Sequence, residues 1–342
     1  MPEADPVQPA VLIRRQGRAG RITLNRAARL NALTREMCQQ ILAALDAWRA
    51  DPAVALVIFD AAGDRAFSAG GDVVAVVKAA RAGDFALGRD FFRDEYRMNA
   101  QIALYPKPVL AFMQGYTMGG GIGIGGHARH RILGETTQMA MPETRIGLVP
   151  DVGASALLAR APGRMGYYLG LTGARMTPGD AVFCGFADRF LAQADWPALI
   201  ARLAESGDPA LLPQGRAPGS DLAGHGAQID RIFARPDLAA IRAAVAQETG
   251  PIADATRAAL AQHDPLAMAA TLQLIAAAQA APGVPEALER EFRFTARAAE
   301  HGDFIEGVRA RLIDRDDRPA WRHASATETD LAAAVATMLA PI

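Results

Sequence analysis

The chain has 342 residues, of which 51% are hydrophobic, and its 36 basic and 37 acidic side chains leave a net charge of -1. A chain of this length and apolar content can form one large domain, or one domain with a helical appendage. The balance of charges excludes a basic protein that binds nucleic acid or an anionic membrane surface through its overall charge.

The cysteines and the N-terminus indicate the compartment. Only Cys38 and Cys184 are present, both in apolar surroundings, which excludes a disulfide framework and favours a cytoplasmic location. The N-terminal MPEADPVQPAVLIRR lacks the basic segment and apolar core of a signal peptide. The longest apolar runs are far shorter than the roughly 18 residues that a membrane-spanning helix needs. We therefore expect a soluble, cytoplasmic protein.

Strands and helices alternate through the first part of the chain. Thr34 is the expected N-cap of the first helix, because apolar residues follow it at helical spacing. We expect two short strands around a glycine turn within 11–24, further strands at 55–60, 108–115 and 131–134, and helices at 33–50, 73–104 and 156–161. This alternation predicts an α/β core.

The pattern changes after residue 190, where strand signals end. Residues 206–226 are rich in proline and glycine and predict a linker or exposed loop. Beyond them we expect only helices, one of which starts at Asp264 and Pro265, with two more at 284–300 and 303–312. We therefore expect a core at 1–205 that carries the active site, and a linker with a C-terminal helical region at 206–342.

The stretch MGGGIGIGG at 118–126 contains a G-x-G-x-x-G sequence at Gly121, Gly123 and Gly126. A dinucleotide site needs a normal helix after these glycines and then a second strand that ends in an acidic residue. Here the five glycines of 120–126 make a poor helix, and the next strand pattern begins only a few residues later. Glu143 lies 20 residues after Gly123 but follows a proline. The sequence therefore disfavours dinucleotide binding.

Metal and serine-hydrolase sites are also disfavoured. His127 and His130 have i, i+3 spacing but no third ligand at a suggestive distance, so we interpret them as one half-buried and one surface histidine and expect no metal. The segment GAS, which ends at Ser155, lacks the second glycine of the motif G-x-S-x-G.

Two glycine-rich turns, SAGGD and MGGG, each follow an expected buried strand. Glycine lets a ligand approach the main chain closely, and N–H groups at a helix start have no partner within the helix. Two such turns side by side would form an oxyanion hole. The alternative is that the glycines only allow helix and sheet to pack closely.

Glu143 and Asp151 lie in the segment PETRIGLVPD, where Gly147 and Pro150 exclude a regular helix. Irregular loops are the usual place for catalytic groups. Two carboxyl groups close together can have their pKa values driven apart, which provides a base or nucleophile and an acid. The alternative is that Asp151 only caps the helix that follows.

Taken together, these segments resemble the enoyl-CoA hydratase/isomerase (crotonase) superfamily. The resemblance rests on LNRAARLNAL, FSAGGD, KPVLAFMQGYTMGGGIGI and MPETRIGLVPDVGA, which occur in this order. Within the superfamily the chain is most similar to thioester hydrolases, through FRDEYRMN, GYYLGLTGARM and the C-terminal EHGDFIEGVRARLIDRDDRPAW. The resemblance implies an α/β, crotonase-like spiral of ββα units with a helical C-terminal region.

The resemblance also implies an acyl-CoA site. The N–H groups of Gly71 and Gly120 would bind the thioester oxygen, Glu143 and Asp151 would be catalytic, and Glu95 would contact the hydroxyl of the acyl group. Further implied substrate contacts are Ala66, Ser68, Ala69, Arg26 and Arg29.

One departure from the hydratase pattern bears on the reaction. Hydratases of the superfamily use two glutamates, one at the position of Glu143 and one at the position where this chain has Gly123. Asp151 stands where a hydratase usually has glycine and where the hydrolases have aspartate. The resemblance therefore implies hydrolysis rather than hydration.

We expect hydrolysis of a short 3-hydroxyacyl-CoA, with 3-hydroxyisobutyryl-CoA of valine catabolism as substrate and 3-hydroxypropionyl-CoA as the near alternative. Glu143 would attack the carbonyl or activate water. The competing hypotheses are a hydratase or isomerase of the same superfamily and a non-catalytic acyl-CoA-binding protein. No cofactor is expected, because CoA is part of the substrate, and assembly into a homo-oligomer stays open.

Overall fold

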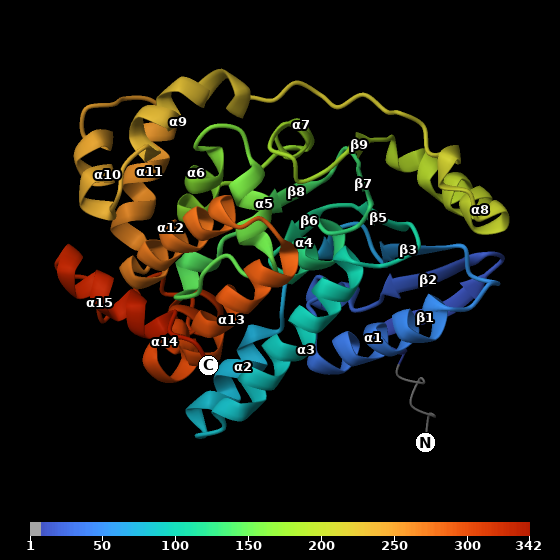
Figure 1. The fold of residues 1–342 in the computed structure, drawn as a ribbon, viewed down its shortest axis with the longest axis horizontal. Coiled ribbons are helices and arrows are strands. Elements are labelled where there is room, and N and C mark those ends of the chain that lie inside the picture. Colours follow the sequence, from blue (N-terminus) through green and yellow to red (C-terminus); the bar gives the residue numbers. More distant parts are fainter. Residues whose placement is uncertain (1–7) are drawn as a thin grey trace.

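A computed structural model describes residues 8–342 of the protein (Figure 1). The larger sheet has the strand order β1-β2-β3-β5-β7-β9. Its strands are β1 (Val11–Gln16), β2 (Ala19–Leu24), β3 (Leu56–Ala61), β5 (Val109–Met113), β7 (His130–Leu133) and β9 (Arg189–Phe190). β1 and β2 pair antiparallel, and every later pair is parallel. The segments that follow β3, β5 and β7 therefore leave the sheet at the same edge.

A smaller parallel sheet lies at that edge. It consists of β4 (Ala66–Ser68), β6 (Tyr116–Met118) and β8 (Gln138–Ala140). Each of these strands follows one strand of the larger sheet along the chain, and a helix comes after it. The succession of a long strand, a short strand and a helix is the expected ββα unit. Because the unit repeats, the three turns that follow β4, β6 and β8 lie next to one another.

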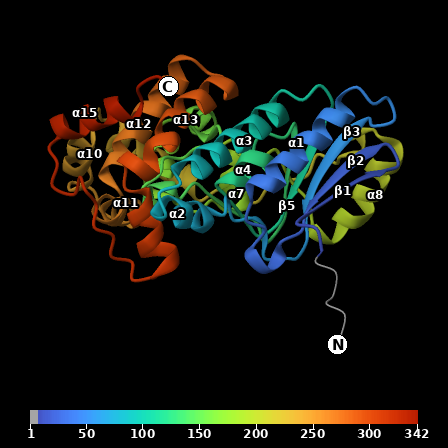
Figure 2. The same cartoon turned by 90° about the horizontal axis from the view of Figure 1, so that it is seen from below.

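Helices cover both faces of the larger sheet (Figure 2). α1 (Arg35–Arg49) starts at Thr34, whose side chain accepts a hydrogen bond from Met37 N, and it buries Ile41 and Leu45 in the core on one face. α8 (Trp196–Ser206) covers the other face with Trp196 and Leu203. The strands between them are continuous apolar runs because both of their faces are buried.

The C-terminal helices α9–α15 gather at the end of the molecule away from β1 and β2 (Figure 1). They share one hydrophobic core with the rest, since α12 packs on α5, α13 packs on α3, and the rings of Phe92 and Phe304 lie 6.2 Å apart. The remaining helices are α2 (Val73–Arg81), α3 (Phe85–Ala103), α4 (Gly120–Gly125), α5 (Ala154–Arg160), α6 (Met165–Thr172), α7 (Pro178–Phe183), α9 (Gly226–Phe233), α10 (Leu238–Val245), α11 (Pro251–Gln262), α12 (Pro265–Ala280), α13 (Val284–His301), α14 (Phe304–Val308) and α15 (Glu328–Met338). Shorter helical turns are η1 (Ala27–Arg29), η2 (Glu143–Ile146), η3 (Gln193–Asp195), η4 (Pro209–Leu211), η5 (Leu222–His225) and the π-helical η6 (Arg309–Ile313).

Most elements expected from the sequence are present, and the differences have local causes. The expected helix at 73–104 is two helices, because Gly83 adopts a φ of +90° and Asp84 caps α3 through Leu87 N. The expected helix at 303–312 is α14 followed by the π-helical η6. The strands of the smaller sheet were not expected, because three residues are too few to show alternation. The expected linker at 206–226 runs from α8 across to α9 with only two short 3-10 turns (Figure 1).

Among residues 8–342, no helix is long and apolar enough to cross a membrane. The first seven residues, part of the segment in which no signal peptide is expected, lie outside the described residues.

Candidate active site

A pocket of about 360 Å³ lies where the turns after the short strands meet α3 and the C-terminal region. Its lining comes from the segments 69–73, 91–95, 118–120, 142–151 and 311–317. Of the residues expected in the site, Ala69, Gly71, Glu95, Gly120, Glu143 and Asp151 all line this one pocket.

The two glycine turns touch each other on the pocket wall. Gly70 has a φ of +104°, and a Cβ at this position would lie 3.3 Å from Met118 O and 3.6 Å from Gly120 N. Within residues 8–342, the N–H groups of Gly71 and Gly120 donate to no protein acceptor. Two free N–H groups on neighbouring turns are what an oxyanion hole requires.

Two glutamates flank the second turn. A Cβ at Gly120 would collide with Glu95 Oε1, and a Cβ at Gly119 would lie 2.8 Å from Glu143 Oε1. Glu95 comes from α3 and Glu143 from the start of η2. The turn therefore needs glycines for a reason beyond helix packing, because any side chain there would push a carboxylate aside.

Asp151 is the third buried carboxylate. Its Oδ2 accepts a hydrogen bond of 2.6 Å from the hydroxyl of Tyr96. The Asp151 side chain does not cap α5, because Glu291 accepts the hydrogen bonds from Gly153 N and Ser155 N at the start of that helix. Asp151 instead faces the pocket.

Burial raises the pKa of all three carboxyl groups. The pKa of Asp151 rises to about 7, and its bond from Tyr96 opposes the rise. The pKa values of Glu95 and Glu143 lie well above their ordinary value, first because of burial and then because of the charge of Asp151. Three such groups cannot all be ionised near neutral pH, so the pocket holds both proton donors and proton acceptors.

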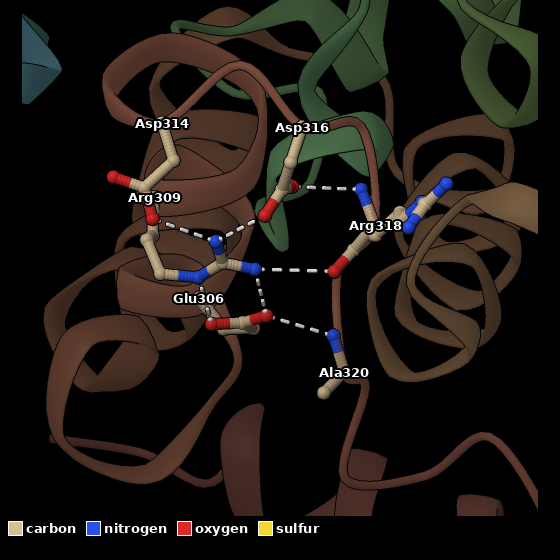
Figure 3. Close-up of polar contacts among 6 residues, drawn as sticks. All are labelled: Glu306, Arg309, Asp314, Asp316, Arg318 and Ala320. Atoms are coloured by element: carbon tan, nitrogen blue, oxygen red, sulfur yellow. Dashed lines mark hydrogen bonds and ion pairs between the residues drawn. The ribbon is translucent and has the colours of Figure 1, made fainter.

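A C-terminal strap, residues 309–318, closes one side of the pocket. Arg309 holds its ends together, since the guanidinium bonds Glu306, Asp314 and Asp316 at 2.6–2.9 Å and donates to Arg318 O at 3.1 Å (Figure 3). Within the strap, Arg311 donates to Asp317 at 2.6 Å, and both side chains line the pocket.

Four residues expected to contact substrate lie outside this pocket. Ser68 is buried and donates to Asn31 O at 2.9 Å. Arg26 pairs with Asp72 at 3.1 Å, and Arg29 is exposed at the end of η1. Ala66 lines a separate hollow of about 40 Å³. Their role in binding CoA stays a prediction.

Sequence reasoning did not find Tyr96, Glu291 or Arg311. Tyr96 follows Glu95 directly, and a buried tyrosine beside a candidate acid was an available signal. Glu291 and Arg311 had none, because they reach the site only through the packing of α13 and the path of the strap. Of the two histidines, expected as one half-buried and one on the surface, His127 is buried with its Nε2 2.7 Å from Val152 O, and His130 is half-buried.

Comparison with known proteins finds a family model and relatives that match most of this chain. The family model described as enoyl-CoA hydratase/isomerase matches residues 19–339. The protein named 3-hydroxyisobutyryl-CoA hydrolase, mitochondrial, of Gallus gallus is 37% identical over 93% of this chain and 86% of its own length. The protein named 3-hydroxyisobutyryl-CoA hydrolase 1 of Arabidopsis thaliana is 38% identical over 92% of this chain and 87% of its own length.

Two solved structures are similar over nearly the whole chain. The crystal structure of a protein named enoyl-CoA hydratase, from Rhodobacter sphaeroides, is 54% identical, with a TM-score of 0.93 and 98% of each chain covered. That of a protein named carnitinyl-CoA dehydratase, from Mycobacterium thermoresistibile, is 37% identical, with a TM-score of 0.91, and the match covers 98% of this chain and 97% of the other.

Proposed function

The chain belongs to the enoyl-CoA hydratase/isomerase family, and from this premise we propose that it hydrolyses the thioester of 3-hydroxyisobutyryl-CoA to 3-hydroxyisobutyrate and CoA. The family's crotonase-like fold is confirmed by the similarity to whole solved structures. Support for the reaction comes from the names of the relatives and from the chemistry of the pocket.

The thioester carbonyl lies between the two glycine turns in this proposal. The N–H groups of Gly71 and Gly120 bind its oxygen and stabilise the negative charge that develops when the carbonyl carbon is attacked. One such donor typically contributes about 2.7–4 kcal/mol to lowering the barrier. The apolar side chains of Phe91 and Phe92 on the pocket wall limit the access of water.

Glu143 supplies the attack by one of two routes. Its carboxylate either adds to the carbonyl carbon, so that CoA thiolate leaves and water then hydrolyses the mixed anhydride, or it takes a proton from the water that attacks directly. In both routes the carbon–sulfur bond breaks, the acyl carbon gains an oxygen that comes ultimately from water, and the thiolate takes up a proton.

Asp151 and Glu95 serve the proton and the acyl group. Asp151, with its pKa near neutral, gives the proton to the leaving thiolate or orients the substrate hydroxyl. Glu95, which touches Gly120, contacts the hydroxyl of the short acyl group.

The observation that carries the choice of hydrolysis is the environment of Gly123. A Cβ at this position would lie 2.7 Å from Asn99 Nδ2 and 2.8 Å from Val152 Cβ. A second glutamate of the hydratase type therefore has no room on α4 unless α3 and the turn after Asp151 move apart. Two-glutamate hydration of an enoyl-CoA is thus disfavoured by packing as well as by the missing carboxylate.

The test is the release of CoA from 3-hydroxyisobutyryl-CoA, followed with a thiol reagent, for the wild type, Glu143→Gln and the surface control Glu36→Gln. We expect Glu143→Gln to lose most of the activity and the control to keep it. Equal rates for Glu143→Gln and the wild type would refute the role of Glu143.

A hydratase is the second candidate, because the similar protein from Rhodobacter sphaeroides is named enoyl-CoA hydratase. Incubation with crotonyl-CoA separates the two, because hydration removes the absorbance of the conjugated thioester. Efficient hydration would overturn the hydrolase proposal. 3-Hydroxypropionyl-CoA lacks one methyl group, and a difference of this size gives discrimination of only about 1–3 kcal/mol.

Several further expectations belong to this proposal. The division into a core at 1–205 and a C-terminal region at 206–342 assigns the catalytic groups to the core and the strap to the appended region. CoA enters as part of the substrate, so no separate cofactor is proposed. The cytoplasmic location stays a prediction, since the named animal relatives are mitochondrial. Assembly into a homo-oligomer also stays a prediction.

A further inference from the structure

The turn between Asp151 and α5 has an unfavourable backbone conformation. Val152 adopts a φ of +55° and Gly153 one of +81°. The left-handed region is open to glycine but is unfavourable for a β-branched residue. Such a conformation persists only where the surroundings hold it, and here it directly follows a proposed catalytic carboxylate.

Two buried side chains from other elements hold this turn. His127, just after α4, lies with Nε2 2.7 Å from Val152 O. Burial lowers the pKa of His127 to about 4, so the ring is neutral and Nε2–H donates to this carbonyl. Glu291, on α13, accepts hydrogen bonds from Gly153 N at 2.6 Å, Ser155 N at 2.9 Å and Ser155 Oγ at 2.5 Å. Both polar groups of the Val152–Gly153 peptide, its carbonyl and its N–H, are therefore held by buried side chains.

α13, which carries Glu291, also contacts the residues around Asp151 through a second side chain. Thr295 lies one turn after Glu291 on α13, and its Oγ1 is 3.2 Å from the hydroxyl of Tyr96, which donates to Asp151. Glu291 has no exposed surface, and Thr295 is buried as well. α13 thus contacts the Asp151 carboxyl group through Tyr96 and the Asp151 backbone through the turn.

A purely structural need does not account for Glu291. An exposed serine, asparagine or aspartate next to α5 would cap that helix without burying a charge. Instead a fully buried glutamate performs the task from 138 residues away, and its pKa is raised to about 7 by burial. The site it stabilises is the turn that sets the direction of Asp151.

We infer that Glu291, assisted by His127, is a positioning residue for the reaction, which holds the left-handed Val152 turn and thereby aims the Asp151 carboxylate into the pocket. The inference rests on the proposed function, because its effect on catalysis is measured as CoA release. It also gives the C-terminal helical region a part in positioning Asp151, because the core supplies His127 but Glu291 comes from α13.

The test compares Glu291→Gln and Glu291→Ala with the control Asp180→Asn. Asp180 is also a buried acid that accepts backbone hydrogen bonds at a helix start, and it lines no part of the pocket. Glutamine keeps the length and one acceptor oxygen of Glu291, but its amide nitrogen cannot accept from Gly153 N. We expect kcat for CoA release to fall about tenfold in Glu291→Gln and on the order of 100-fold in Glu291→Ala, with little change in KM.

Hydrogen exchange of residues 149–158 gives a readout that does not depend on turnover. We expect faster exchange of this segment in both Glu291 variants and unchanged exchange in Asp180→Asn, even where melting temperatures fall by similar amounts. Should Glu291→Ala fail to fold, Glu291→Gln decides the matter. A folded Glu291 variant with wild-type kcat would overturn the inference.

A wild-type chain that releases no CoA would refute the proposed function alone. The inference is then decided by exchange, since unchanged protection of residues 149–158 in both Glu291 variants overturns it and lost protection supports it.

Discussion

The hydroxyl of Tyr96 donates a 2.6 Å hydrogen bond to Asp151 Oδ2, and both groups are buried. The bond joins α3, which also carries Glu95, to the loop that begins at Glu143. It lowers the pKa of Asp151 against the effect of burial, so Tyr96 influences both where this carboxyl group points and when it is ionised.

Replacing Tyr96 with phenylalanine removes that donor without changing the ring. Asp151 is left with an unpaired buried oxygen, a loss typically of about 1–3 kcal/mol, and its pKa rises further. We expect kcat to fall about tenfold or more, as the loss of one such bond implies. The matched control is Tyr105→Phe, which loses a 2.6 Å bond to Leu45 O outside the pocket. Steady-state kinetics of CoA release check this, and equal kcat in the two variants would contradict it.

The pH dependence of the rate should report the carboxyl cluster. In the proposed mechanism Glu143 acts as an anion, and its pKa lies well above that of an ordinary glutamate, so activity should rise with pH over a range well above pH 4.5. Asp151→Asn removes a negative charge that disfavours ionisation of Glu143, and the acid limb of kcat/KM should therefore move to lower pH. The measurement is the residual rate of Asp151→Asn from pH 4 to 9. A limb that stays in place would show that Asp151 does not interact with Glu143.

The same groups should affect stability. A carboxyl group whose pKa is higher when folded favours the folded state below the unfolded pKa, and this advantage is lost as pH rises to the folded pKa. For Asp151 the window runs from 3.8 to about 7. Asp151→Asn should thus be more stable than the wild type at pH 8, by at most about 4 kcal/mol, and show little difference at pH 4. Urea unfolding at both pH values checks this. The exposed control Asp254→Asn should show no such divergence.

The part of the site that the sequence could predict is the part held within short segments. The turns and loops after the strands contain Gly71, Gly120, Glu143 and Asp151, and their glycines and prolines exclude regular structure. Because the strands are parallel, these turns and loops lie at the same edge of the sheet. Glu291 could not be predicted in this way, because its position depends on how α13 packs against α3 and α5. The resemblance implied Arg26 and Arg29 as substrate contacts, and neither lines the pocket.

The fold also has parts that the sequence pattern predicts and parts that it does not. The larger sheet and α1 follow from apolar runs and helical spacing, and Thr34 caps α1 as expected. The smaller sheet depends on three-residue strands that gain their stability from neighbours rather than from sequence. The π-helical turn η6 begins at Arg309, and apolar spacing does not separate it from the α-helix that precedes it.

Arg309 provides a test of the strap as part of the binding site. Its half-buried side chain joins three carboxylates and one carbonyl, which a lysine cannot do because an ammonium lacks the planar fork of donors (Figure 3). Loss of these contacts should free Arg311 and Leu312 from the pocket wall. We expect KM for the acyl-CoA to rise severalfold in Arg309→Ala and less in Arg309→Lys, with a smaller change in kcat.

The control Arg89→Ala breaks an exposed 3.3 Å pair with Glu300 and should leave KM unchanged, because exposed pairs contribute little. Hydrogen exchange of residues 309–318 should increase in Arg309→Ala, and normal protection together with a wild-type KM would show that the strap does not depend on Arg309.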